Sequence, residues 1–283
     1  MASPIAESWI YATMLIENEW GDRGTGFLVA RELEDGGGRV FLATNKHVLH
    51  REAQMRQIAT RVLLHLSIRD EDGSIAGKVA ELPLNLEDGS NVWREHPDRD
   101  VDVLAFNVTP LLVQHPQIIR KWPRYSLFAD HAKLDELEIT IGEDILVIGY
   151  PLGLRHAKSN FPLVRSGIIA TRIGENLEDE VEERGIRRRR LLRGFLIDGA
   201  VVPGSSGSPV ILKPSIGRFK GGGINIGSSP PLLLGIVAET KYAPVRTPSG
   251  TIPSFAGLGL AFDAETVRET IELFFSPGDT PPS

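Results

Sequence analysis

Ser206 lies in the segment VVPGSSGSPV, residues 201–210, in a setting that could make a serine reactive. A serine hydroxyl is a poor nucleophile unless a neighbouring base takes its proton. It also needs backbone N–H groups aimed at the oxyanion that forms during acyl transfer, and glycine permits the tight backbone that this requires. Of the three serines in the segment, only Ser206 has a glycine two residues before it and another directly after it. A plain Gly/Ser/Pro loop explains the segment about equally well, so the decision depends on the rest of the chain.

A histidine and an aspartate with suitable neighbours occur earlier in the chain. His47 follows an apolar stretch in FLATNKHVLH, and an aspartate precedes an apolar stretch in HPDRDVDVLAFNV. The order His, then Asp, then Ser is one of several orders known for catalytic triads. In a triad the histidine accepts the serine proton, while the aspartate holds the imidazole in the correct tautomer and stabilises its cation.

Eight short segments in order along nearly the whole chain make the sequence resemble the chymotrypsin-fold serine peptidases, and among them the bacterial trypsin-like peptidases related to the HtrA/Deg group. They are GTGFLV, ATNKHVL, DVLAFNV, GEDILVIGYPLG, SGIIA, PGSSGSPV, LLGIVAE and GLGLAFDAETVRETI. The resemblance implies a serine endopeptidase that works through an acyl-enzyme. It assigns the triad to His47, an aspartate and Ser206, and the oxyanion hole to the N–H groups of Gly204 and Ser206.

The resemblance also implies an all-β fold of two six-stranded antiparallel β-barrels packed side by side, with the active site between them. Many short apolar runs separated by turn signals agree with this, including SWIYATMLI and hairpins around EDGGG and DEDGS. The expected parts are an N-terminal barrel over 1–120, a linker over 121–135, a C-terminal barrel over 136–262, a helix over 263–275 and a disordered tail over 276–283. Asp263 is the candidate N-cap of that helix.

Three aspartates, Asp98, Asp100 and Asp102, compete for the triad position. In the family pattern the second residue after the catalytic aspartate is buried and the fifth is exposed and polar. From Asp102 these positions fall on Leu104 and Asn107. From Asp100 a second carboxylate would fall in the buried position, which is costly without a partner. We therefore predict Asp102, with Asp100 as the alternative.

Two further expectations concern substrate binding. By resemblance, the peptide adds as a strand along Gly235, Ile236 and Val237, and Ala200 lies at the base of the pocket for the side chain that precedes the cut. Because Ala200 carries no charge, small or medium apolar side chains are expected there, unless Asp198 reaches into the pocket.

Ser205 stands where the secreted digestive relatives carry an aspartate that pairs with an N-terminus freed by cleavage. A serine cannot form that ion pair. We therefore expect no activating cleavage of that kind.

The arginine run at 187–190 suggests a nucleic-acid or partner-binding patch, but an acidic stretch precedes it. A hairpin closed at 184–185 places three acidic residues opposite three arginines: Glu182 and Arg187, Glu180 and Arg189, Asp179 and Arg190. Such cross-strand pairs are favourable. We predict a self-neutralising surface hairpin. The alternatives are a nucleic-acid or partner-binding protein that uses these arginines, and a catalytically silent peptide-binding module on the same fold.

Composition sets the remaining limits. With 41% hydrophobic and 24% charged residues the chain is ordinary for a soluble globular protein, and its net charge of -6 gives no general attraction to nucleic acid or anionic membranes. The first 20 residues lack a basic segment followed by a long apolar run, so no signal peptide is expected, and the sequence has no stretch of about 20 apolar residues. The absence of cysteine excludes disulfides and fits a reducing compartment, so a cytoplasmic location is expected.

The pair His47 and His50 has no obvious third ligand nearby, and we expect neither metal nor cofactor. The expected partner is a polypeptide substrate, with neither nucleic acid nor membrane, and the oligomeric state stays open.

Overall fold

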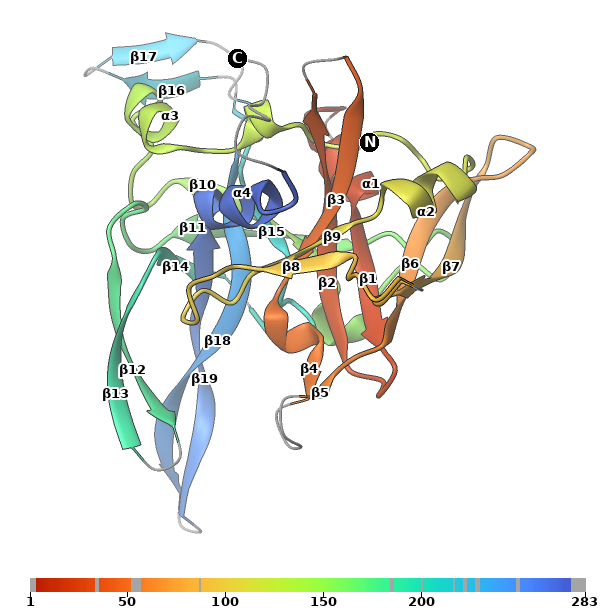
Figure 1. Cartoon of the computed structure of the whole chain (residues 1–283). Coiled ribbons are helices and arrows are strands. Elements are labelled where there is room, and N and C mark those ends of the chain that lie inside the picture. The colour runs from red at the N-terminus through yellow and green to blue at the C-terminus, as the bar shows by residue number, and fades with distance from the viewer. Residues whose placement is uncertain are drawn as a thin grey trace.

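The computed structural model describes residues 4–33, 36–51, 57–86, 88–183, 186–199, 201–215, 217–220, 223–226, 230–247 and 250–275. Within these ranges the chain is mostly β-strand and forms two antiparallel structures that lie side by side, one from each half of the chain (Figure 1). The predicted all-β, chymotrypsin-like architecture is confirmed.

The N-terminal half forms, within the described residues, a sheet of seven antiparallel strands. In the order in which they pair, they are β7 (Ile75–Pro83), β6 (Arg61–Arg69), β1 (Thr13–Asn18), β2 (Arg23–Glu32), β3 (Gly38–Thr44), β9 (Leu104–Asn107) and β8 (Trp93–Glu95). The hairpins predicted around EDGGG and DEDGS are confirmed as β2–β3 and β6–β7, although residues 34 and 35 of the first turn lie outside the described residues.

This first sheet differs from the predicted six-stranded barrel in strand number and in closure, because its end strands β7 and β8 are not paired with each other. The outer edge of β7 is occupied by the other half of the chain instead. The Gly77 N–H donates to the Lys158 carbonyl at 2.7 Å, so a segment of the C-terminal half occupies a place that another barrel strand would take.

The C-terminal half forms a closed six-stranded barrel, and the strands in order around it are β10 (Asp144–Gly149), β11 (Leu163–Ile169), β14 (Gly194–Asp198), β19 (Gly250–Asp263), β18 (Leu233–Thr247) and β15 (Pro209–Leu212). The predicted surface hairpin lies between β11 and β14 in the chain, as β12 (Leu177–Glu183) and β13 (Ile186–Leu192). The strands β18 and β19 continue past the barrel as a two-stranded ribbon beside that hairpin (Figure 1).

The smaller elements connect and cover these sheets. Two short pairs are β4 (His50–Arg51) with β5 (Gln57–Ile58), and β16 (Gly217–Lys220) with β17 (Gly223–Ile226). The helices are α1 (Pro4–Ala12), α2 (Thr109–Gln114), α3 (His131–Glu136) and α4 (Ala264–Glu272), and the 3-10 turns are η1 (Lys46–Val48), η2 (Tyr125–Leu127) and η3 (Pro151–Gly153). None of the described helices is long and apolar enough to cross a membrane.

Helix α1 replaces the first part of a predicted strand. The segment SWIYATMLI has strand-like composition, but only the part from Thr13 onward belongs to β1. Trp9 is fully buried, and its indole N–H donates to the Pro231 carbonyl of the other half at 3.0 Å. This tertiary contact outweighs the strand propensity of the aromatic residues.

Helix α4 lies within the range in which a C-terminal helix was predicted. The residues that follow it pack against the N-terminal sheet. Asp263 occupies its N-cap position but makes no side-chain capping bond, and burial raises the pKa of this carboxyl to about 6. Phe274 and Phe275 follow the last helical turn and pack against Phe41 of β3, with ring centroids 5.1 and 5.7 Å away. The predicted tail over 276–283 lies outside the described residues.

Candidate active site

His47 and Asp102 lie in direct contact. His47 is in η1, immediately after β3, and Asp102 is in the loop that leads into β9. The ring Nδ1 of His47 is 2.5 Å from Asp102 Oδ2, and the backbone N–H of His47 donates to Asp102 Oδ1 at 3.2 Å. The side chain of Asn45 donates to the Asp102 carbonyl at 2.6 Å. One short turn therefore holds both oxygens of the carboxylate and the backbone behind it.

The electrostatics of this contact fix the tautomer of His47. Burial alone would raise the pKa of the Asp102 carboxyl, but the charge of His47 and hydrogen bonds from His47 and Lys46 hold this pKa below its usual range. Asp102 is therefore ionised at neutral pH, and an ionised carboxylate can only accept. The proton between the two groups belongs to Nδ1, so a neutral His47 keeps a lone pair on Nε2.

Asp100, the alternative to Asp102, has another partner. Its carboxylate receives two hydrogen bonds from Arg188 of β13, at 2.9 and 2.5 Å. Hydrogen bonding to Arg188 lowers the pKa of this carboxyl. Leu104 is fully buried, as the register that starts from Asp102 predicts, whereas Asn107 is half-buried rather than exposed.

Further hydrogen bonds fix the loop that carries Asp102. Lys46 Nζ donates to the carbonyls of His96 and Asp98 at 2.8 and 3.0 Å, and the desolvation of this amine lowers its pKa. The buried His96 accepts the Asp98 N–H through Nδ1 and contacts Glu269 of α4 through Nε2 at 2.9 Å. Residues 45–47 thus brace the whole of the loop 96–102.

Ser206 lies at the other side of the site, in the turn before β15. Its carbonyl accepts the Thr25 N–H at 2.8 Å, which joins the serine turn to β2 of the N-terminal half. Its hydroxyl donates to the carbonyl of Ala238 in β18 at 3.2 Å. The conformation of the turn requires glycine at two places, because Gly204 and Gly207 have φ of +88° and +85°. A Cβ at Gly204 would collide with the Tyr150 carbonyl, and one at Gly207 with the Thr25 carbonyl.

The N–H groups of Gly204 and Ser206 are the predicted oxyanion donors. The Pro203 carbonyl accepts the Leu152 N–H at 2.7 Å. Because a trans peptide is planar, the Gly204 N–H points away from that bond. Within the described part of the chain, neither of the two N–H groups donates to an acceptor. Unpaired donors of this kind are available to an oxyanion.

Ser205, the residue before Ser206, makes contacts that the sequence did not predict. Ser205 is fully buried, and its hydroxyl accepts hydrogen bonds from Arg165 Nη2 at 2.9 Å and from the Val202 N–H at 3.3 Å. Arg165 comes from β11, on the wall of the same barrel. These two contacts, both from within the C-terminal half, hold the turn at Ser205. An arginine so far away in the sequence gave no signal of this contact.

The prediction that a substrate strand pairs with Gly235, Ile236 and Val237 is wrong. Both sides of β18 are occupied there, because these residues pair with β15 or its preceding turn on one side and with β19 on the other. The Val237 N–H and carbonyl, for instance, bond to the Ser208 carbonyl and the Gly207 N–H. Pairing of β18 with β15 and its preceding turn stops at Val237. The edge of β18 that faces Ser206 therefore begins at Ala238, three residues after the predicted start at Gly235.

The predicted pocket for the side chain before the cut is described only in part. Ala200, its predicted base, lies outside the described residues. Val201 is buried, and the Thr240 hydroxyl donates to its carbonyl at 3.2 Å, which joins β18 to the segment that precedes the Ser206 turn. Asp198 is exposed while its neighbour Ile197 is fully buried in the barrel core, so the alternation of β14 directs Asp198 away from the barrel interior.

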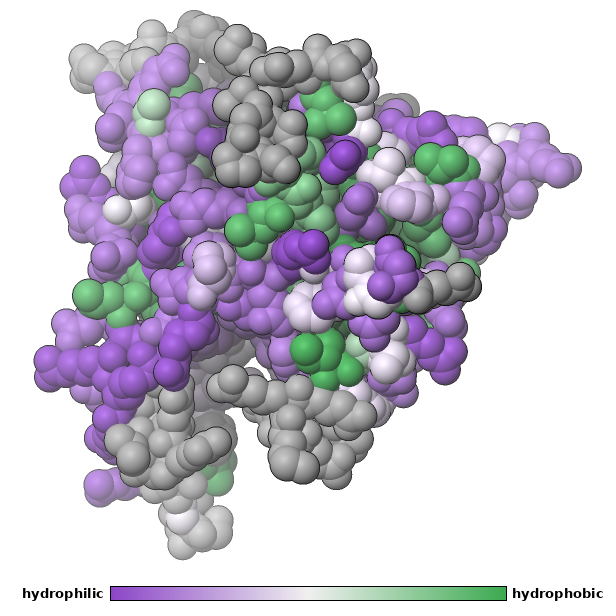
Figure 2. Space-filling view, viewed as in Figure 1, coloured by the Kyte–Doolittle hydropathy of each residue, from purple (hydrophilic) through white to green (hydrophobic). Residues whose placement is uncertain are grey.

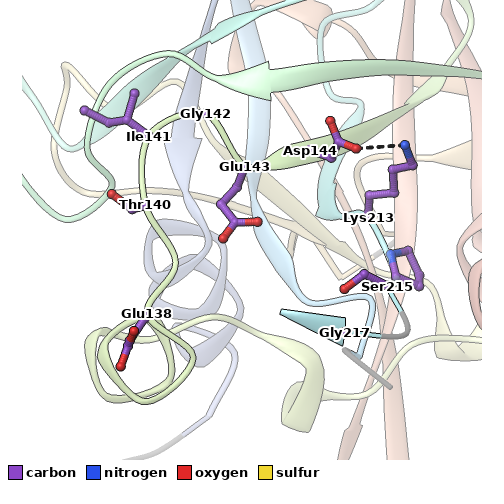
Figure 3. A pocket seen from close by; sticks show the side chains of 10 residues that line it. Glu138, Thr140, Ile141, Gly142, Glu143, Asp144, Lys213, Ser215 and Gly217 are labelled. Carbon is purple, nitrogen blue, oxygen red and sulfur yellow. Dashed lines mark hydrogen bonds and ion pairs between the residues drawn. The ribbon is translucent and has the colours of Figure 1, made fainter. Parts of the chain in front are cut away.

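Other candidate groups lie away from this constellation. His50 contacts Glu95 at 2.5 Å rather than joining His47. The described residues contain no group of three or more His, Asp or Glu side chains arranged to hold a metal ion. A cavity of about 520 Å³ opens near the start of β10, where Lys213 pairs with Asp144 (Figure 3). The five residue steps of β10 put it roughly 17 Å from the Ser206 end of that strand.

Comparison with known proteins points to one family. Residues 24–219 match the family described as the trypsin-like peptidase domain. The fold is similar to that of the Rv3671c protease from M. tuberculosis in its active form, with 16% identity, a TM-score of 0.50, and coverage of 99% of this chain and 86% of that one. It is also similar to Deg5, with 15% identity, a TM-score of 0.50, and coverage of 95% and 91%. These two likenesses concern the fold. No curated protein sequence matches this chain.

Proposed function

The chain belongs to the trypsin-like peptidase domain family and is a serine protease, and from this premise we propose that His47, Asp102 and Ser206 form its catalytic triad. The observation that carries the proposal is the 2.5 Å contact between His47 Nδ1 and Asp102 Oδ2. It leaves Nε2 of His47 as the base. The Ser206 turn is joined to the same N-terminal half through Thr25, which supports their convergence.

In the proposed reaction His47 Nε2 takes the Ser206 proton while Oγ bonds to the carbonyl carbon of the peptide. The carbonyl π electrons move to oxygen, and the N–H groups of Gly204 and Ser206 stabilise the oxyanion. Collapse of this tetrahedral intermediate breaks the C–N bond, and the imidazolium of His47 gives its proton to the leaving amine. The remaining ester is the acyl-enzyme. Water, deprotonated by His47, then attacks this ester and releases Ser206 and the new carboxyl end.

The substrate strand in this proposal adds to β18 from Ala238 to Thr240, antiparallel to it. Its direction follows from β15, which lies antiparallel on the same edge and begins beside Ser206. The residue before the cut then lies next to Ala238, and earlier residues lie further along β18. Without substrate, the Ser206 hydroxyl donates a hydrogen bond to the Ala238 carbonyl. In the proposal, a peptide N–H of the substrate replaces the hydroxyl as the donor to this carbonyl.

A burst experiment tests the proposed chemistry. With an activated ester, such as a p-nitrophenyl ester, rapid acylation and slower deacylation give a burst of released nitrophenol before the steady state. We expect a burst that approaches one equivalent per chain. If peptides bind but neither an ester burst nor peptide hydrolysis occurs, the protein is the silent peptide-binding module.

The side chain before the cut is expected to be small or medium and apolar, such as Ala, Val or Leu. Ala200 carries no charge, and the side chain of Asp198 is directed away from the barrel interior, so a Lys or Arg side chain would lose hydration without gaining a partner. Mass spectrometry of the cut sites in a peptide library measures this preference. A majority of cuts after Arg or Lys would contradict it.

A further inference from the structure

The hairpin β12–β13 has two different faces. Its predicted register is confirmed, with Glu180 opposite Arg189 and Asp179 opposite Arg190. Hydrophilic side chains cover this region of the surface (Figure 2). Arg189 is 76% exposed and pairs with Glu178 and Glu180 of its own hairpin. Because side chains alternate along a strand, Arg188 and Arg190 point to the opposite face.

The inner face of the hairpin reaches beyond it to both halves of the molecule. Arg188 binds Asp100 of the N-terminal half through two hydrogen bonds. Arg190, only 11% exposed, binds Glu239 of β18 in the C-terminal half at 2.8 and 2.9 Å, as well as Asp179 of the hairpin. Lys241 Nζ closes this network by contacting Asp179 at 2.8 Å and Glu239 at 3.2 Å.

The two anchors flank the candidate active site. Asp100 lies two residues before Asp102, and Glu239 directly follows Ala238, whose carbonyl holds the Ser206 hydroxyl. The Cα atoms of Arg188 and Arg190 are roughly 7 Å apart, which is the span of two strand residues. One strand face therefore bridges the two halves next to the triad. The loop between β8 and β9 reaches across toward β13 (Figure 1).

We propose that the hairpin β12–β13 is a latch beside the substrate-binding edge of β18, closed by the Arg188–Asp100 ion pair, and that it limits how far a polypeptide can extend on the amino-terminal side of the cut. The inference rests on the proposed function, since residues before the cut are those that lie along Glu239 and beyond. A peptide with few residues before the cut fits with the latch closed. A longer one needs the Arg188–Asp100 pair to open, while Arg190 keeps the hairpin attached to β18.

Two internally quenched peptides test the latch. They share the residues around the cut and differ in length before it, one with three residues and one with ten. Arg188→Gln should raise kcat/KM for the long peptide roughly three- to tenfold, as expected for the loss of one partly buried ion pair, and leave the short peptide unchanged. The matched control Arg189→Gln, on the outer face, should change neither. Added salt should favour the long peptide in the parent but not in Arg188→Gln.

The outcomes separate the latch from other roles of the same residues. Equal effects of Arg188→Gln on both peptides would overturn the latch, because the pair would then act by positioning the Asp102 loop. No effect on either peptide would overturn it as well. A double-mutant cycle of Asp100→Asn and Arg188→Gln in urea unfolding measures the ion pair without using activity. If the cycle shows coupling but the parent cleaves neither peptide, the proposed function fails, not the ion pair.

Discussion

Ser206→Ala is expected to lower kcat for casein or a peptide substrate by about 10⁶-fold, because it removes the atom that forms the acyl-enzyme. It should also abolish labelling by a fluorophosphonate. The fold should survive, since the hydroxyl makes one hydrogen bond to Ala238 and its loss costs about 1 kcal/mol of the free energy of unfolding. Initial rates and a thermal unfolding curve measure both parts.

Ser208→Ala is the matched control for this change. Ser208 lies two residues away and is fully buried, and its hydroxyl has no hydrogen-bond partner among the described residues. Its removal should leave proteolysis near the parental rate. A Ser206→Ala protein that still cleaves casein at the parental rate would show that the nucleophile is another group.

Asp102→Asn is expected to lower kcat by about 10⁴-fold. An amide can donate through its nitrogen, so His47 no longer has to carry its proton on Nδ1, and the Nε2 lone pair is lost to the wrong tautomer. The cation of His47 also loses its neighbouring negative charge. KM should change much less than kcat, because Asp102 lies behind the histidine. Steady-state kinetics on one short peptide separate the two quantities.

Asp100→Asn provides the comparison, because it changes the same group two residues away. Its carboxylate binds Arg188 instead of His47, so a much smaller effect on kcat for the short peptide is expected. A larger loss of kcat in Asp100→Asn than in Asp102→Asn would mean that the assignment of the two carboxylates is reversed.

Features of the site that depend on residues close together in the chain could be predicted from the sequence. An apolar Leu104 and a polar Asn107 at the second and fifth positions predicted which aspartate faces His47, because the types of residue along one strand are read directly from the chain. A turn at residues 184–185 likewise predicted the register of the hairpin, in which three acidic residues face arginines. The glycines at 204 and 207 indicated the tight turn for the same reason, as their positive φ is a local requirement.

Contacts between distant segments could not be predicted in the same way. The substrate edge was placed three residues too early because nothing in LLGIVAET indicates where its pairing with β15 and the turn before β15 stops. The Arg188 pairing with Asp100 and the Arg165 pairing with Ser205 each join segments far apart in the chain. A single sequence shows charge and spacing along the chain, whereas these pairs depend on how distant segments pack in three dimensions. The same is true of Trp9, whose burial against Pro231 turns a strand-like segment into helix α1.

The most direct test of the triad is to map a diisopropyl fluorophosphate adduct by peptide mass spectrometry. The account predicts one adduct per chain, on Ser206, formed rapidly in the parent and slowly in Asp102→Asn. An adduct on Ser205, Ser208 or a serine outside the 201–210 turn, or no adduct in a folded protein that cleaves peptides, would contradict it.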